Sequence, residues 1–277
     1  MSLATARSLL FAPGNEERKL QKALAAGADA VVADLEDAVP VGEKEAARAV
    51  TRCLLGGAAT GSLVAVRVNG VGTAHWEADL DAVADLELDA LVVPKATPDA
   101  VGALGPDGPP VVAIVETALG VRHAYETARL PRVAALVLGA VDLGLELGLE
   151  ARADGQEVLY ARSRLVVDSA AAGVRSPFDL VHVDTRDDEG LEAEARLARS
   201  LGFRGKACIH PAQVEIVNRV FTPTEEERER ARRIVETYEQ ALADRRGTIA
   251  LDGEMIDLPV VERARRVLAE TERSVSE

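Results

Sequence analysis

Residues 30–37 read AVVADLED. The run starts with four apolar residues, so both faces of the segment are apolar, which is typical of a strand buried on both sides in a parallel sheet. It then changes within four positions to three acids, Asp34, Glu36 and Asp37. A buried strand that ends in ionisable side chains predicts a functional site at the carboxyl ends of the strands.

Seven further runs rich in Val, Leu and Ala occur along the chain, and stretches of helical composition separate them. The predicted strands are Ser8–Ala12, Ala30–Asp34, Leu63–Val68, Ala90–Val93, Val111–Val115, Ala134–Leu138, Leu180–Val183 and Ala207–Ile209. The predicted helices are Glu16–Ala26, Glu43–Leu55, Ala74–Leu86, Asp99–Leu104, Val121–Arg129, Gln156–Ala172, Glu189–Ser200 and Ala212–Val220. Eight strand–helix units in strict alternation predict an α/β fold, a TIM (β/α)8 barrel.

The chain continues beyond the eighth unit. We expect a barrel catalytic domain over residues 1–222 and a C-terminal helical extension over residues 223–277. Thr224–Glu227 is a plausible capping box at the start of a charged helix that runs to about Asp244. A turn-rich stretch, Arg245–Asp257, precedes a last helix near Val260–Glu270. This extension is expected to be a lid or a contact with a neighbouring subunit.

The composition argues against several classes of protein. The 277 residues, 48% hydrophobic and 28% charged, suit one globular barrel of about 250 residues with a short extension. The net charge of −14 disfavours nucleic acid and anionic membranes as partners, because such binding depends on clustered Lys and Arg. Cys53 and Cys208 have no CxxC spacing, and the N-terminal apolar run is too short for a signal peptide. We expect a cytoplasmic protein with reduced thiols and a small-molecule partner.

Two acids, Glu116 and Asp142, follow the fifth and sixth predicted strands. In a barrel the ends of adjacent strands converge, so both carboxylates can reach one cation. Hard oxygen ligands without a cluster of His and Cys favour Mg²⁺ or Mn²⁺ over zinc. The alternative is structural, with each acid paired to a nearby Arg or capping a loop.

Two bases also lie at predicted strand ends. Arg67 stands within an otherwise apolar strand, where a guanidinium is costly unless it meets an anion. It is expected to clamp an oxyanion or a carboxylate, to form an ion pair with Glu36 or Asp37, or to do both. Lys95 could hold substrate or form a Schiff base, although a metal site offers a competing way to stabilise a carbanion.

With these residues located, the chain closely resembles the citrate lyase β-subunit-like (CitE-like) family, within the HpcH/HpaI aldolase and malyl-CoA lyase superfamily. The resemblance spans nearly the whole sequence, and several motifs in register make it specific. The motifs are Arg7–Asn15, Asp34–Val39 with Lys44 and Arg48, Val66–Asn69, Pro94–Lys95, Glu116–Ala118, Gly139 with Asp142–Leu143, Gly202–Lys206 and Ile209–Gln213.

The resemblance implies a Mg²⁺ ion bound by Glu116 and Asp142, with Arg67 steadying the substrate carbonyl or enolate. Within the matched motifs, Glu36 and Asp37 are expected to take part in catalysis. The expected substrate-binding residues are Arg67, Pro13, Gly14, Lys95 and Gly139.

The resemblance also implies a role for Asp257 that strand counting misses. Residues 252–257 read DGEMID, where relatives in the family carry Lys in place of Glu254. Asp257 would then be the acid/base residue, delivered to an adjacent subunit of a homotrimer or hexamer. From the residues alone, Asp257 is better explained as the N-cap of the final helix.

The implied enzyme is a carbon–carbon lyase of the oxo-acid-lyase type. It would cleave or form a malyl-, citramalyl- or citryl-CoA thioester, with an acetyl thioester and a 2-oxo acid as the other partners. The alternatives are a citrate lyase β subunit that acts on citryl-acyl-carrier protein, a metal-dependent aldolase for free hydroxy-oxo acids, and a non-catalytic acyl-CoA-binding subunit. The acyl group depends on pocket shape, which the sequence does not display.

Overall fold

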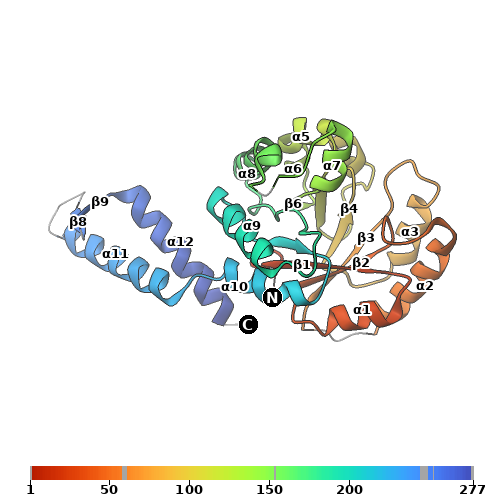
Figure 1. Cartoon of the computed structure of the whole chain (residues 1–277), viewed down its shortest axis with the longest axis horizontal. Coiled ribbons are helices and arrows are strands. Elements are labelled where there is room, and N and C mark those ends of the chain that lie inside the picture. Colours follow the sequence, from red (N-terminus) through yellow and green to blue (C-terminus); the bar gives the residue numbers. More distant parts are fainter. Residues whose placement is uncertain (1, 58–60, 153, 244–248, 252, 276–277) are drawn as a thin grey trace. The chain divides into compact units, whose positions relative to one another are not determined.

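The structure is a computed structural model, and it describes residues 2–57, 61–152, 154–243, 249–251 and 253–275. The chain divides into two compact units, residues 1–221 and 222–277. Figure 1 shows the first unit as helices around a set of strands, and the second as two long helices with a short hairpin between them. No helix among the described residues is long and apolar enough to cross a membrane.

Seven parallel strands form the sheet of the first unit, in the order β6-β5-β4-β3-β2-β1-β7. They are β1 (Ser8–Pro13), β2 (Ala30–Asp34), β3 (Leu63–Arg67), β4 (Ala90–Val93), β5 (Val111–Val115), β6 (Val133–Leu138) and β7 (Lys206–Cys208). Two isolated bridges, Val137 to Phe178 and Asp179 to Lys206, link β6 to β7 and make the sheet a nearly closed barrel. The predicted α/β barrel is confirmed.

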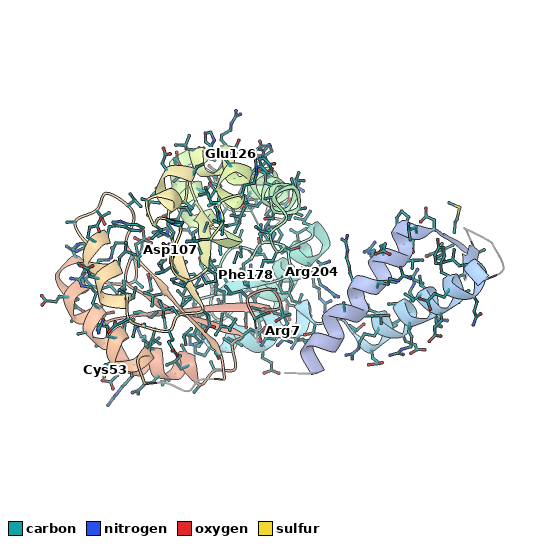
Figure 2. The ribbon with its side chains drawn as sticks, turned by 180° about the vertical axis from the view of Figure 1, so that it is seen from behind. Arg7, Cys53, Asp107, Glu126, Phe178 and Arg204 are labelled. Atoms are coloured by element: carbon teal, nitrogen blue, oxygen red, sulfur yellow. The ribbon has the colours of Figure 1, made fainter. Side chains whose placement is uncertain are left out.

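The predicted strand Leu180–Val183 is wrong. The chain pairs with its neighbours slightly earlier, at Phe178 and Asp179, and forms only single bridges there. Phe178 is fully buried inside the barrel, at the seam between β6 and β7 (Figure 2). Val183, by contrast, is 67% exposed. Residues 180–183, three of them apolar, line a cavity, and a short apolar run of this kind is not distinguished from a strand by its sequence.

The strands are apolar on both faces because both faces are buried. In β5 the side chains of Val112 and Ile114 pack inside the barrel. Those of Val111, Ala113 and Val115 pack against the surrounding helices. This alternation follows from the two-residue period of a strand, and it explains why the runs read as continuously apolar in the sequence.

Helices follow the strands and cover their outer face (Figure 1). They are α1 (Glu17–Leu24), α2 (Lys44–Leu55), α3 (Trp76–Val83), α4 (Pro98–Gly102), α5 (Ala118–Arg122), α6 (Ala124–Ala128), α7 (Ala140–Leu147), α8 (Leu159–Ala172), α9 (Asp188–Leu201) and α10 (Ala212–Phe221), with 3-10 turns at Val41–Glu43 and Gln156–Val158. The predicted helix over residues 121–129 is two short helices, α5 and α6. The predicted helices do not include α7, because the residues that follow the sixth predicted strand are expected to form a loop.

The second unit contains α11 (Glu225–Ala243), β8 (Ile249–Leu251), β9 (Glu254–Ile256) and α12 (Leu258–Val275). The capping box is confirmed, since the Glu227 N–H donates to Thr224 Oγ1 at 3.1 Å and the Thr224 N–H donates to Glu227 Oε2 at 2.8 Å. The stretch expected to consist of turns contains the antiparallel pair β8–β9. The core of the second unit is formed by residues of both helices and of β9: Ala231, Ile234, Tyr238, Ile256, Val261 and Ala264.

Phe178→Ala should strongly destabilise the first unit. The variant leaves a cavity where the phenyl ring fills the barrel seam, so the free energy of unfolding should fall by about 3–5 kcal/mol. Urea unfolding followed by circular dichroism measures this loss. The control is Leu145→Ala, because Leu145 is 84% exposed and its replacement should change stability by less than about 0.5 kcal/mol. A small effect of Phe178→Ala would show that the seam does not depend on this ring.

Candidate active site

The site is built from side chains that continue the inward faces of the strands. In β5, Val112 and Ile114 point into the barrel, so the next inward position is Glu116. By the same two-residue step, Asp34 ends the inward face of β2 and Arg67 that of β3. These two residues are register partners in neighbouring strands. Charged side chains therefore gather at one end of an otherwise apolar interior.

A cavity of about 320 Å³ opens at this end of the barrel. Its charged lining residues are the acids Asp34, Asp37, Glu116 and Asp142 and a single base, Arg67. Its apolar walls come mainly from the inward positions of four strands, β1, β5, β6 and β7: Phe11, Pro13, Ile114, Val137, Gly139, Ala207 and Ile209. A small apolar pocket with few converging charges is the usual form of a small-molecule site.

Arg67 is held by two acids. Its Nε and Nη2 atoms lie 2.7 and 2.5 Å from the two carboxylate oxygens of Asp34, and its Nη1 lies 3.0 Å from Glu36 Oε2. The guanidinium also stacks over the Phe11 ring, 5.3 Å from its centroid. Burial by itself lowers the pKa of Arg67, but the bidentate contact with Asp34 and the charge of Glu36 outweigh it and raise the pKa, and the Asp34 contact also fixes the plane of the guanidinium. The predicted contact of Arg67 with Glu36 is confirmed. The second acid that the structure shows against Arg67 is Asp34, which was not predicted as its partner, and not Asp37.

Glu116 is 95% buried, and its charge is therefore costly. Burial raises the pKa of its carboxyl to about 7, against the lowering effect of a hydrogen bond from the Lys95 N–H to Oε1 at 2.7 Å. A Cβ atom at Gly139 would lie 2.6 Å from Glu116 Oε2 and 2.5 Å from its Cβ. Gly139, predicted to bind substrate, thus also leaves the space that the Glu116 side chain needs.

Asp142 lies in the first turn of α7, where the helix N-terminus favours a negative charge. It is 35% exposed and shares with Glu116 one ammonium neighbour, Lys95 Nζ, at 3.5 Å from Asp142 Oδ2 and 3.9 Å from Glu116 Oε1. The structure therefore brings the two predicted metal ligands to the same place. The predicted alternative, pairing of each acid with an Arg, is not what these contacts show.

Other predicted residues lie around the cavity in different ways. Pro13 lines it and Asp37 lies exposed at its edge. Gly14 is buried beside β2, where a Cβ would lie 2.8 Å from the Asp34 carbonyl oxygen, so close packing excludes a side chain there, and substrate binding by Gly14 stays a prediction. Lys95 and Glu36 border an adjoining cavity of about 560 Å³. Burial raises the pKa of Glu36, although Arg67 and Lys95 oppose the shift.

The donor set fits a hard divalent cation. Among the described residues, no three His, Cys, Asp or Glu side chains are gathered so as to hold a metal. Two carboxylates, with the remaining positions left to water and substrate, match the usual way in which proteins bind Mg²⁺. Glu116 and Asp142 are the residues that could hold the ion.

Asp257 belongs to the second unit, between β9 and α12. Its Oδ1 accepts the N–H of Val260 at 3.4 Å, and its backbone carbonyl accepts the N–H of Val261 at 3.1 Å. This is the N-cap arrangement that the residues alone favoured. Asp252, in the same motif, lies outside the described residues, and an acid/base role for Asp257 stays a prediction.

The pairing of Asp34 with Arg67 is the feature of the site that the sequence does not predict. Asp34 is expected as one of the acids at the end of a strand, but the predicted ion-pair partners of Arg67 are Glu36 and Asp37. In the structure Asp34 and Arg67 are the last residues of β2 and β3, and they are register partners. Opposite charges at matched positions of adjacent parallel strands predict an ion pair.

Glu116→Gln should alter how stability depends on pH in metal-free protein. The folded-state pKa of Glu116 is about 7, against 4.5 for the ordinary group, so between these values the folded chain keeps a proton that the unfolded chain releases. The free energy of unfolding therefore falls as pH rises through this window. Glutamine removes that loss, and the variant should exceed the wild type by about 3 kcal/mol at pH 8 but not at pH 4. Urea unfolding in EDTA tests this, and identical pH profiles would contradict it.

Comparison with known proteins identifies relatives over the whole chain. A family model described as HpcH/HpaI aldolase/citrate lyase matches residues 7–102 and 106–211. The chain is 41% identical to a (3S)-malyl-CoA thioesterase of Cereibacter sphaeroides, over 96% of this chain and 94% of the relative. It is 36% identical to a citrate lyase subunit β of Leuconostoc mesenteroides, over 95% and 92%.

A solved structure agrees with these relatives. CitE from Mycobacterium tuberculosis, in complex with magnesium, acetoacetate and coenzyme A, superposes with a TM-score of 0.84. Its sequence is 35% identical, and the match covers 98% of this chain and 100% of that one. On these matches, the chain belongs to the HpcH/HpaI aldolase/citrate lyase family of lyases.

Proposed function

We propose that the chain is a Mg²⁺-dependent lyase that cleaves a 3-hydroxyacyl thioester of the malyl-, citramalyl- or citryl-CoA type to an acetyl thioester and a 2-oxo acid, or runs the reverse Claisen condensation. The observation that carries the proposal is the pair Glu116 and Asp142 beside Arg67 in one cavity. The CitE structure with magnesium, acetoacetate and coenzyme A supports the same chemistry. The acyl group is left open among the three types.

The metal would be held by Glu116 and Asp142. Bound there, Mg²⁺ supplies a Lewis acid for the oxygen that becomes the carbonyl of the 2-oxo acid. The cavity lining has four acids against one base, so it is short of positive charge without a cation. Gly139 keeps the Glu116 carboxylate free to turn toward the cavity, because no side chain lies against it there.

Arg67 would stabilise the negative charge of the enolate. Cleavage moves the electrons of the C2–C3 bond onto the thioester half, and a fixed cation nearby lowers the energy of that charge. Asp34 holds the guanidinium through two contacts, so Arg67 is already oriented and little free energy is needed to reorganise it during the reaction. Asp34 is thus a positioning residue, and Asp37 and Glu36 shape the charge around it.

Asp257 would exchange the proton that the reaction requires. In the cleavage direction the hydroxyl loses a proton and the acetyl carbon gains one. We assign both transfers to Asp257, brought by the extension of an adjacent subunit in a homotrimer or hexamer: its carboxylate would take the proton of the hydroxyl and return a proton to the acetyl carbon. The DGEMID segment supports this assignment, and the N-cap contact of Asp257 is compatible with it because only one carboxylate oxygen is used.

Glu116→Gln and Asp142→Asn should each abolish cleavage through loss of the metal. Isothermal titration with Mn²⁺ should show one site per chain in the wild type and binding weakened at least about a hundredfold in each variant. A panel of malyl-, citramalyl- and citryl-CoA, assayed with and without EDTA, reports the acyl preference. The control is Glu146→Gln, since the Glu146 carboxylate accepts the Ala118 N–H at 2.9 Å outside the cavity lining. Full activity of Glu116→Gln with magnesium present would sink the metal assignment.

Thioester hydrolysis is a second candidate. It is favoured by the 41% identity to (3S)-malyl-CoA thioesterase of Cereibacter sphaeroides. The products separate the two reactions, because a lyase releases acetyl-CoA and a 2-oxo acid while a thioesterase releases free CoA and the hydroxy acid. Thiol release without any 2-oxo acid would replace the lyase proposal by hydrolysis.

A citrate lyase β subunit acting on citryl-acyl-carrier protein is a third candidate, favoured by the 36% identity to that subunit of Leuconostoc mesenteroides. Cleavage of free CoA thioesters by the purified chain alone would exclude a strict need for a carrier protein. Turnover of free hydroxy-oxo acids without CoA would instead favour the aldolase alternative.

Asp257→Asn should separate the chemical role of this residue from its structural one. Asparagine is as good an N-cap as aspartate, so the thermal midpoint should change by no more than about 2 °C. The turnover number should fall by about 10²–10⁴, because the amide does not exchange a proton as the carboxyl does. Wild-type turnover in this variant would contradict the acid/base assignment.

Mixing two inactive variants tests whether Asp257 acts in an adjacent subunit. If subunits exchange, a mixture of Glu116→Gln and Asp257→Asn assembles some sites with an intact barrel and an intact neighbouring extension. Activity should reappear in the mixture but in neither variant alone. Mixtures that stay inactive, although mass spectrometry shows mixed oligomers, would place Asp257 in the site of its own chain.

A further inference from the structure

Lys95 lies among three carboxylates. Its Nζ atom is 2.9 Å from Glu36 Oε1, 3.5 Å from Asp142 Oδ2 and 3.9 Å from Glu116 Oε1. Two of these acids are the proposed ligands of the divalent cation. The ammonium is therefore the positive charge nearest to both carboxylates that would bind the metal.

The backbone of Lys95 is held in an unusual conformation. Lys95 has φ = +49° and is the only residue other than glycine with a positive φ among the described residues. A left-handed backbone at a side chain of this size is costly, and such strain is typical of functional positions. This conformation directs the Lys95 N–H to Glu116 Oε1, at 2.7 Å. One residue thus contacts Glu116 through its backbone and holds a positive charge near it through its side chain.

The other cations around the site have partners of their own. Arg67 is bound to Asp34 and Glu36. Lys44 donates its Nζ to two backbone carbonyls, those of Leu35 and Glu36, at 2.7 and 2.6 Å. Among the described residues, Lys95 is the base whose ammonium the structure places against both Glu116 and Asp142.

A divalent cation and this ammonium are incompatible at the same place. Mg²⁺ binds carboxylate oxygens at about 2.0–2.1 Å, so Glu116 and Asp142 must close around the ion. The ammonium would then lie beside an ion of like sign, which repels it. The Lys95 side chain is 48% exposed and borders the adjoining cavity of about 560 Å³, next to Glu36 and Asp37. The ammonium can therefore leave Glu116 and Asp142 for this space while Glu36, which it already contacts at 2.9 Å, remains its partner.

We propose that Lys95 is a built-in counter-ion, which holds Glu116 and Asp142 together in the metal-free protein and withdraws from both, keeping its contact with Glu36, when the divalent cation binds. The proposal rests on the metal site of the proposed function. Lys95 is a positioning residue in this role. Its backbone contact with Glu116 stays in place during the exchange, so the ligand remains oriented while its counter-ion changes.

Lys95→Gln tests the exchange through stability and metal affinity. The thermal midpoint of the variant should fall by several degrees in EDTA and by clearly less in the Mn²⁺-saturated protein, because the Glu36 contact is lost in both states but the contacts with Glu116 and Asp142 only in the metal-free one. Mn²⁺ should bind roughly tenfold more tightly, because the competing charge is gone. Lys95→Arg, which keeps the charge, should restore the metal-free midpoint, and Lys19→Gln serves as a surface control, since Lys19 pairs only with exposed Glu16 in the described contacts. An equal loss of midpoint in both states, or unchanged Mn²⁺ affinity, would overturn the proposal.

Amine labelling of wild-type protein reports the movement directly. Mass spectrometry should show that acetylation of Lys95 by a mild amine-reactive reagent increases several-fold when Mn²⁺ is added, while acetylation of Lys19 stays constant. Unchanged or reduced labelling of Lys95 would contradict displacement. If the wild type binds no Mn²⁺ by calorimetry, the metal site of the proposed function fails as well. If Mn²⁺ binds but the midpoints, the affinity and the labelling do not shift as stated, only the role of Lys95 fails.

Discussion

The two-residue period of the strands is the constraint on which the rest of the structure depends. Every strand of the barrel is buried on both faces, so each inward residue faces the interior and each outward residue faces a helix. At the carboxyl ends the inward positions become Asp34, Arg67 and Glu116. A shift of one residue in any of these strands would turn its charge into the helix layer. The apolar core and the charged site are thus parts of one alternating pattern.

Charge compensation then decides how the site is arranged. Asp34 and Arg67 neutralise one another at hydrogen-bond distance. The charge of Glu116, by contrast, is disfavoured by burial and is compensated only by a backbone N–H and a more distant ammonium, both of Lys95. The difference makes Arg67 a rigid feature of the pocket and leaves Glu116 with a pKa near 7. An acid in this condition gains most from a strong cation, which is why the pair Glu116 and Asp142 supports a metal role better than Asp34 does.

The barrel seam shows a different use of buried charge. Where an eighth strand would stand, Asp179 contacts Arg162 at 2.9 Å and Lys206 at 3.1 Å, with all three fully buried or nearly so. Glu194 contacts the same two bases, and Lys206 Nζ also donates to the Leu180 carbonyl oxygen at 2.7 Å. Two acids against two bases leave no net charge, so side chains close the gap that backbone pairing does not. A pattern of apolar residues in the sequence does not predict a closure that is made by ion pairs.

The sequence by itself determined the barrel class, seven of the eight strands and the residues at their ends, because a strand buried on both faces leaves a continuous apolar run that stops where the polar rim begins. It also located the capping box at Thr224, which is a local hydrogen-bond pattern. Only the tertiary structure decided which of these residues meet: Asp34 as the partner of Arg67, Gly139 as the space beside Glu116, and Phe178 with Asp179 in place of the expected strand. These are contacts between segments far apart in the chain, and they depend on strand register, on close packing and on the pairing of buried charges, none of which is written in the composition of a single segment.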